Sequence, residues 1–101
     1  METEIKQLAA EIVELLRSKG YTFATAESCT GGAIASAVTR VPGCSDVMLG
    51  GVVAYHNSVK QAMLGVSDDA LCRYGAVSEA VVREMVCGVL QRLGADCAVA
   101  T

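Results

Sequence analysis

Apolar residues recur every three or four positions near the start of the chain, which is the pattern of an amphipathic helix. The pattern covers residues 4–19, with acidic and basic residues between the apolar ones, and Gly20 follows as a typical helix stop. The recurring residues are Ile5, Leu8, Ala9, Ile12, Val13, Leu15 and Leu16. The segment therefore predicts a helix with one apolar face.

Short apolar runs and further helical patterns then alternate along the chain. Strands are predicted at residues 21–26, 46–55 and 97–101. Helices are predicted at residues 30–39, 58–64, 67–73 and 78–93, with Thr30, Ser58, Ser67 and Ser78 as their N-caps. Gly50 and Gly51 interrupt the second strand, which indicates a bulge, a bend or a close approach of another backbone.

This alternation of helices and strands indicates an α/β layered domain built on a largely parallel sheet. Such a sheet is covered on both faces and usually has more than three strands. The sequence ends on a strand, where another strand and helix are expected to follow. We therefore expect residues 1–101 to form a single domain whose C-terminal strands are missing.

Composition narrows the classes of function. The chain has 101 residues, 52% of them apolar, a net charge of −3 and no cluster of basic residues, so nucleic acid is not an expected partner. No apolar run is long enough for a membrane span. Five cysteines form no CxxC pair, and His56 is the only histidine, so we expect no metal site. The odd cysteine count and the absence of a signal peptide predict reduced thiols and a cytoplasmic location.

The most specific local feature is the segment from Glu27 to Gly32, with the sequence ESCTGG, at a predicted junction between strand and helix. Backbone N–H groups at the start of a helix attract anions, and Gly31 and Gly32 remove side chains that would keep a ligand away. Ser28 beside such a site suits either a phosphate-binding loop or a nucleophile with donors for an oxyanion.

A second segment, Tyr55-His56-Asn57-Ser58-Val59-Lys60, follows the next predicted strand, and Ser45 precedes that strand. Ligands of parallel sheets collect at the carboxyl ends of the strands, so we expect Ser28 and Tyr55 to converge there. A serine nucleophile needs a base, which can be a histidine or a lysine whose pKa is lowered by burial. The hydroxyl of Tyr55 can orient or relay the proton.

Together these segments resemble the C-terminal domain of the competence/damage-inducible protein CinA. The similarity extends over AESCTGG, the Tyr-x-Asn-x-x-Lys segment, Leu64-Gly65-Val66, Gly75-Ala76-Val77-Ser78 and the final Ala98-Val99-Ala100-Thr101. The resemblance implies a three-layer α/β/α sandwich, usually oligomeric, that hydrolyses nicotinamide mononucleotide to nicotinate mononucleotide and ammonia without a metal or another cofactor. The implied partners are this small nucleotide and further copies of the same chain. Family members continue beyond the strand at residues 97–101.

Carried to this sequence, the resemblance implies a catalytic set in which Ser28 is the preferred nucleophile, Lys60 the base and Tyr55 an assisting group. Ser45 is implied as a second polar contact and is the alternative nucleophile. The expected substrate-binding residues are Glu27, Thr30, Gly31, Gly32 and Asn57. Several of these also have plain structural explanations: Glu27 complements a helix dipole, Thr30 caps a helix, and Asn57 sits in a turn.

Two other interpretations remain open at this stage. Cys29 at a helix start, paired with His56, is the arrangement of a cysteine amidase. The domain can also be a non-catalytic module that binds a nucleotide or supports assembly, since CinA-type domains also occur fused to a second catalytic domain. Turnover of nicotinamide mononucleotide, compared with binding alone, separates an enzyme from such a module.

Overall fold

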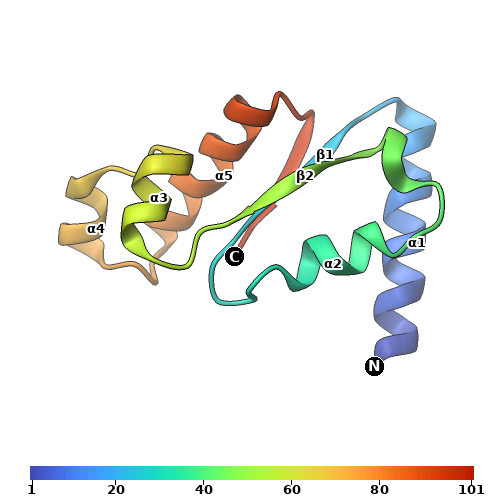
Figure 1. The fold of residues 1–101 in the computed structure, drawn as a ribbon, viewed down its shortest axis with the longest axis horizontal. Coiled ribbons are helices and arrows are strands. Elements are labelled where there is room, and N and C mark those ends of the chain that lie inside the picture. Colours follow the sequence, from blue (N-terminus) through green and yellow to red (C-terminus); the bar gives the residue numbers. More distant parts are fainter.

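The computed structural model describes all residues, 1–101, and consists of five α-helices, a short 3-10 helix and three strands (Figure 1). In chain order the elements are α1 (Glu2–Lys19), β1 (Phe23–Glu27), α2 (Ala33–Thr39), the 3-10 helix η1 (Cys44–Asp46), β2 (Met48–Val53), α3 (Asn57–Leu64), α4 (Asp68–Tyr74), α5 (Glu79–Leu93) and β3 (Cys97–Ala100). Each predicted element is present, with ends that differ by a few residues.

The three strands form one parallel sheet in the order β2-β1-β3. β1 is the central strand, and all five of its residues are buried, as expected for a strand covered on both faces. Its pairing with β2 shifts register between Phe23 and Ala24, where Met48 and Gly50 are the successive partners. Leu49 is therefore an extra residue, and the predicted irregularity next to Gly50 is a β-bulge.

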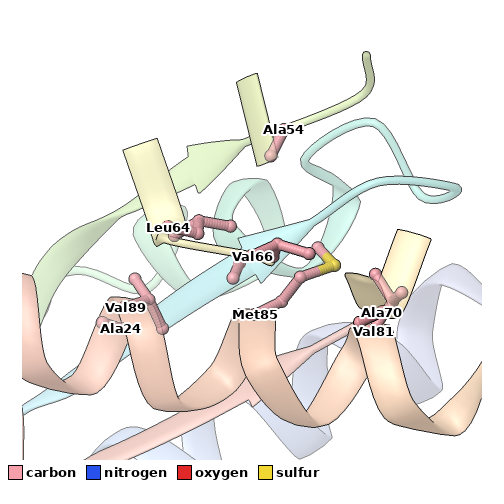
Figure 2. Close-up of a cluster of buried hydrophobic side chains, with 9 residues drawn as sticks. Ala24, Ala54, Leu64, Val66, Ala70, Val81, Met85 and Val89 are labelled. Atoms are coloured by element: carbon pink, nitrogen blue, oxygen red, sulfur yellow. The ribbon is translucent and has the colours of Figure 1, made fainter. Parts of the chain in front are cut away.

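Helices cover both faces of the sheet, which gives the predicted α/β fold three layers (Figure 1). On one face, α5 with α3 and α4 packs over the small side chains Ala24 and Ala26 of β1 (Figure 2). On the other face, α1 and α2 pack over Phe23 and Met48. Alternate residues of β1 thus enter two separate cores, as the two-residue period of a strand requires.

Two of the predicted helix caps are wrong. The N-cap position of α2 is Gly32, with φ 98°, and not Thr30. The N-cap of α3 is His56, whose Nδ1 accepts a hydrogen bond from the backbone N–H of Ser58 at 3.1 Å. Ser67 and Ser78 cap α4 and α5 through their hydroxyl groups, as predicted.

Helix α1 has a wider apolar face than the core covers. Ala9, Val13 and Leu16 are buried. The neighbouring stripe remains 41–57% exposed; it comprises Ile5, Leu8, Ile12 and Leu15. The N-terminal half of the helix projects past the rest of the domain (Figure 1). None of the five helices is long and apolar enough to cross a membrane.

Candidate active site

The candidate site lies at the carboxyl ends of the three strands. Ser28 directly follows β1, the segment from Tyr55 to Lys60 follows β2, and Thr101 follows β3. In a parallel sheet these positions share one edge, and the N–H of Ser28 donates to the carbonyl of Thr101 at 3.0 Å. The parallel topology thus brings together residues from three distant parts of the chain.

Lys60 is the residue of α3 that reaches this edge. Its Nζ lies 3.1 Å from Ser28 Oγ and 2.7 Å from the backbone oxygen of Tyr55, to which it donates. The side chain is only 2% exposed, and no carboxylate forms an ion pair with it. Burial without a counter-ion disfavours the charged amine, and desolvation therefore lowers the pKa of Lys60.

Such an amine can change its hydrogen-bonding role when it loses its proton. A neutral amine still donates to the oxygen of Tyr55 while accepting a hydrogen bond from the hydroxyl of Ser28. The lowered pKa increases the neutral fraction at a given pH. The contact therefore has the geometry of a nucleophile beside its base.

The segment from Ser28 to Gly32 is a tight turn between β1 and α2. Gly31 and Gly32 have φ values of 63° and 98°, which favour glycine strongly over other residues. The N–H of Gly31 donates to the carbonyl of Ser28 at 3.0 Å. The two glycines thus shape the turn that presents Ser28.

Glu27 accepts hydrogen bonds from the first turn of α2. Its Oε1 accepts hydrogen bonds from the N–H of Ile34 at 2.7 Å and the hydroxyl of Thr30 at 2.8 Å, and its Oε2 accepts from the N–H of Ala35 at 2.9 Å. The side chain is fully buried. The expectation that Glu27 contacts substrate is therefore wrong in this structure, and its alternative role at the helix dipole is the observed one.

Burial alone would raise the pKa of Glu27, because it disfavours the carboxylate. The hydrogen bonds from Ala35, Ile34 and Thr30 stabilise the charged form, and together they lower the pKa below its ordinary value. A group with a lowered folded-state pKa stabilises the fold above its unfolded pKa of about 4.3. That contribution is lost as the pH falls through the folded-state pKa.

Replacing Glu27 with Gln is expected to lower the free energy of unfolding at pH 7 by about 1–3 kcal/mol, because the amide NH₂ cannot accept from both buried N–H groups. The difference from the wild type should begin to shrink as the pH falls below the unfolded pKa of about 4.3, and it should vanish only below the lowered folded-state pKa of Glu27. Thermal melts from pH 3 to pH 7 measure this, with the exposed Glu11→Gln as a control. A difference that stays constant across the range contradicts the assigned role of the carboxylate.

Backbone donors remain next to Ser28 although Glu27 occupies the helix start. The N–H groups of Cys29, Thr30 and Gly32 donate no hydrogen bond within the chain. The hydroxyl of Thr30 is engaged with Glu27 and with the hydroxyl of Thr101, each at 2.8 Å. Thr30 can therefore contribute its N–H to a ligand more readily than its side chain.

A cavity of about 380 Å³ opens beside Ser28. Its lining combines Ser28, Cys29 and Thr101, which follow β1 and β3, with the segment before α5 and the first turns of that helix, including Val77, Ser78 and Met85. Lys60 does not line the cavity. Lys60 is buried and its Nζ contacts Ser28 Oγ, so a ligand in the cavity meets Ser28 first.

Ser45 does not join this site within one chain. It lies on η1, before β2, whereas Lys60 follows β2. At about 3.3 Å per residue, the six residues of β2 separate the two ends by roughly 20 Å. The expectation that Ser45 supplies a second polar contact beside Ser28 is wrong for the single chain, because Ser45 is at the amino edge of the sheet.

Tyr55 and Asn57 lie near the site, yet their side chains face solvent. Tyr55 is 76% exposed, and its hydrogen bond with Lys60 is made by the backbone oxygen. Asn57 is the exposed first residue of α3. Neither side chain makes a hydrogen bond in the chain, so the predicted assistance by the Tyr55 hydroxyl has no contact that supports it here.

The alternative pairing of Cys29 with His56 is absent. His56 Nδ1 lies 2.9 Å from Ser58 Oγ and accepts from the N–H of Ser58, as part of the α3 cap. Cys29 is exposed at the cavity wall and has no such partner. No three His, Cys, Asp or Glu side chains lie close enough together to hold a metal ion.

Thr101 is the residue of this site that the sequence did not single out individually. Its carbonyl fixes the backbone of Ser28, its hydroxyl contacts that of Thr30, and it lines the cavity. Knowing that β3 pairs with β1 would have identified Thr101, because the residue after β3 then lies beside the residue after β1.

Comparisons with known proteins agree with this architecture. A CinA-like protein of Prochlorococcus marinus is 53% identical over 95 residues, which is 94% of this chain and 22% of the relative. A CinA-like protein of Thermotoga neapolitana is 53% identical over 89 residues, 88% of this chain and 22% of the relative. The chain therefore spans less than a quarter of the length of these curated relatives.

Solved structures match the fold closely. The competence/damage-inducible protein CihA of Agrobacterium tumefaciens has a TM-score of 0.93 and 44% identity, and the match covers 95% of this chain and 58% of that one. The competence damage-inducible protein ComA of Klebsiella pneumoniae has a TM-score of 0.93 and 38% identity, covering 95% and 60%. Residues 5–101 match the family described as the CinA C-terminal domain, and the chain belongs to that family.

Proposed function

We propose that this domain hydrolyses the carboxamide of nicotinamide mononucleotide to nicotinate mononucleotide and ammonia, with Ser28 as nucleophile and Lys60 as base. The observation that carries the proposal is the 3.1 Å contact between Lys60 Nζ and Ser28 Oγ, made by an amine that is buried and has a lowered pKa. A buried, unpaired lysine costs stability, and a role in proton transfer accounts for its presence.

In the proposed reaction, Ser28 Oγ attacks the carboxamide carbon while neutral Lys60 takes the hydroxyl proton. The carbonyl oxygen becomes an oxyanion, and we expect it to be stabilised by the N–H of Cys29, a residue of the cavity lining whose N–H donates no hydrogen bond within the chain. The C–N bond then breaks, and Lys60 returns the proton to the leaving ammonia. Water attacks the resulting ester while Lys60 accepts one of its protons; the ester C–O bond then breaks, and Lys60 returns that proton to Ser28 Oγ, which releases the acid and regenerates the serine hydroxyl.

The cavity supports an aromatic amide as the substrate class. Its apolar wall, which includes Val77, Val82 and Met85, suits a flat ring next to the reacting carboxamide. The volume of about 380 Å³ is within the range for small-molecule sites.

Ammonia release from nicotinamide mononucleotide tests the proposal directly. Ser28→Ala is expected to reduce turnover by at least about 10³-fold, because no oxygen then forms the acyl-enzyme. Ser45→Ala and Cys29→Ala serve as matched controls and are expected to keep turnover. Ligand-induced melting shifts without turnover in the wild type would indicate a binding module and contradict the proposal.

Loss of turnover in Ser45→Ala alone would reassign the nucleophile. Because Ser45 and Lys60 lie at opposite ends of β2, that result would require Ser45 to reach the site from another copy of the chain. Mixing Ser45→Ala with Lys60→Met chains and regaining activity would identify such an arrangement.

A further inference from the structure

The hydroxyl of Thr30 joins two side chains from distant parts of the chain. It donates to Glu27 Oε1 at 2.8 Å and lies 2.8 Å from Thr101 Oγ1. A threonine hydroxyl has a single proton, and an ionised carboxylate can only accept. Because the proton of Thr30 is used on Glu27, the hydroxyl of Thr101 is the donor in the second contact. The three side chains therefore form a hydrogen-bond chain with one direction, from Thr101 through Thr30 to Glu27.

Both ends of this hydrogen-bond chain are themselves held in place. Glu27 is the last residue of β1, is fully buried, and accepts two backbone hydrogen bonds from the first turn of α2. Thr101 follows β3, the strand paired with β1, and its carbonyl accepts the N–H of Ser28 at 3.0 Å. The hydroxyl of Thr30 is thus anchored on two sides, directly beside the candidate nucleophile.

The turn at residues 28–32 has few other contacts that fix its backbone. Gly31 and Gly32 have positive φ values, and glycine allows the backbone more conformations than any other residue. The N–H groups of Cys29 and Thr30 donate no hydrogen bond within the chain. Among residues 29–32, only Thr30 makes a hydrogen bond with its side chain. The direction of the two free N–H groups therefore depends on how the side chain of Thr30 is held.

We propose that Thr30 is a positioning residue for the hydrolysis proposed above, on which this inference rests: its hydroxyl holds the N–H groups of Cys29 and Thr30 toward the oxyanion. The charge on the substrate oxygen develops only in the transition state, and donors that are already in place stabilise it without reorganisation. Loss of the hydroxyl should therefore lower kcat and leave KM nearly unchanged.

Thr30→Val removes the hydroxyl and keeps the branched shape of the side chain. Its kcat for nicotinamide mononucleotide is expected to fall about 10–100-fold, with a change in KM below about 3-fold. Thr30→Ser keeps the hydroxyl and should recover most of the lost kcat. Thr39→Val is the matched control, because the hydroxyl of Thr39 bonds only to a backbone oxygen within α2, and it should keep the wild-type kcat.

A Thr30→Val chain with the wild-type kcat, or a Thr30→Ser chain as slow as Thr30→Val, would overturn the proposal. So would a loss that lies in KM alone, because the donors would then act on the ground state. Should Thr30→Val not fold, Thr101→Val removes one of the two anchors instead and is subject to the same comparison.

NMR order parameters of the ligand-free chain test the positioning role independently of turnover. In the wild type, the N–H groups of Cys29 and Thr30 are expected near the value of about 0.85 that is typical of rigid backbone, and in Thr30→Val below about 0.6. Thr30→Ser and Thr39→Val should keep the wild-type values. A wild type without turnover contradicts the proposed function, whereas equal order parameters in the wild type and Thr30→Val contradict the positioning role.

Discussion

Replacing Lys60 with Met is expected to reduce amide hydrolysis by about 10²–10⁴-fold and, at the same time, to raise the melting temperature at neutral pH. Turnover falls because Met cannot accept the proton of Ser28. Stability rises because a buried amine that holds a proton lacks a counter-charge, and Met has a similar unbranched shape without that cost. A residue with a purely structural role would not show opposite effects on activity and stability.

The stability difference between the wild type and Lys60→Met should depend on pH. Burial lowers the folded-state pKa of Lys60 below its unfolded value of about 10.4. Between these two values the unfolded chain binds more protons, so the contribution of Lys60 to stability improves as the pH rises through this window. The advantage of Lys60→Met should therefore be full below the folded-state pKa and disappear as the pH approaches about 10.4.

Lys60→Arg provides the matched comparison. Arg stays charged at every working pH and cannot act as a base, so this variant should lose turnover as Lys60→Met does. It keeps the buried charge in a larger side chain, so its melting temperature should fall instead of rising. Full turnover in either variant would rule out Lys60 as the base, whatever the melting temperatures are.

The contact between Ser28 and Lys60 is the part of the site that the sequence predicts best. Both residues follow predicted strands of a parallel sheet, and the carboxyl ends of such strands share one edge. The same rule excludes Ser45 from this site, because Ser45 precedes β2 and therefore lies at the amino edge of the sheet. The resemblance of the surrounding segments placed Ser45 in the site, but the local order of strand and serine argues against it within one chain.

The roles of Glu27 and Thr101 depend on information that no local pattern contains. Glu27 reaches the N–H groups of Ile34 and Ala35 only because the turn through Gly31 and Gly32 folds α2 back over the end of β1. Thr101 reaches Ser28 only because β3 lies beside β1, an order that local patterns do not fix. Element types follow from periodicity, whereas these contacts follow from chain path and strand order.

The burial of helix α1 also could not be predicted from local sequence patterns. The three- and four-residue spacing of its apolar residues predicts the helix correctly, yet it does not indicate how much of the apolar face the domain covers. Only the side with Ala9, Val13 and Leu16 meets the core. Spacing therefore predicts the helix but not how much of its apolar face is buried.

Gly88→Ala is expected to destabilise the domain by about 2 kcal/mol, which is close to 10 °C in melting temperature for a chain of this size. Alanine normally stabilises a helix interior by about 1 kcal/mol relative to glycine. At Gly88, however, a Cβ would overlap the backbone oxygen of Leu64 and lie 2.8 Å from its carbonyl carbon. Backbone atoms cannot rotate away, so α3 and α5 must move apart in the core shown in Figure 2.

That movement should also reach the candidate site, because Leu64 and Lys60 lie one turn apart on α3. Displacing α3 lengthens the contact between Lys60 Nζ and Ser28 Oγ, so turnover should fall even at temperatures where Gly88→Ala remains folded. Cys87→Ala, at the exposed neighbouring position of α5, is the matched control and should change neither property. Melting curves and ammonia release measured well below the transition separate the two effects. A destabilised variant with unchanged turnover would show that the position of α3 does not limit the chemistry.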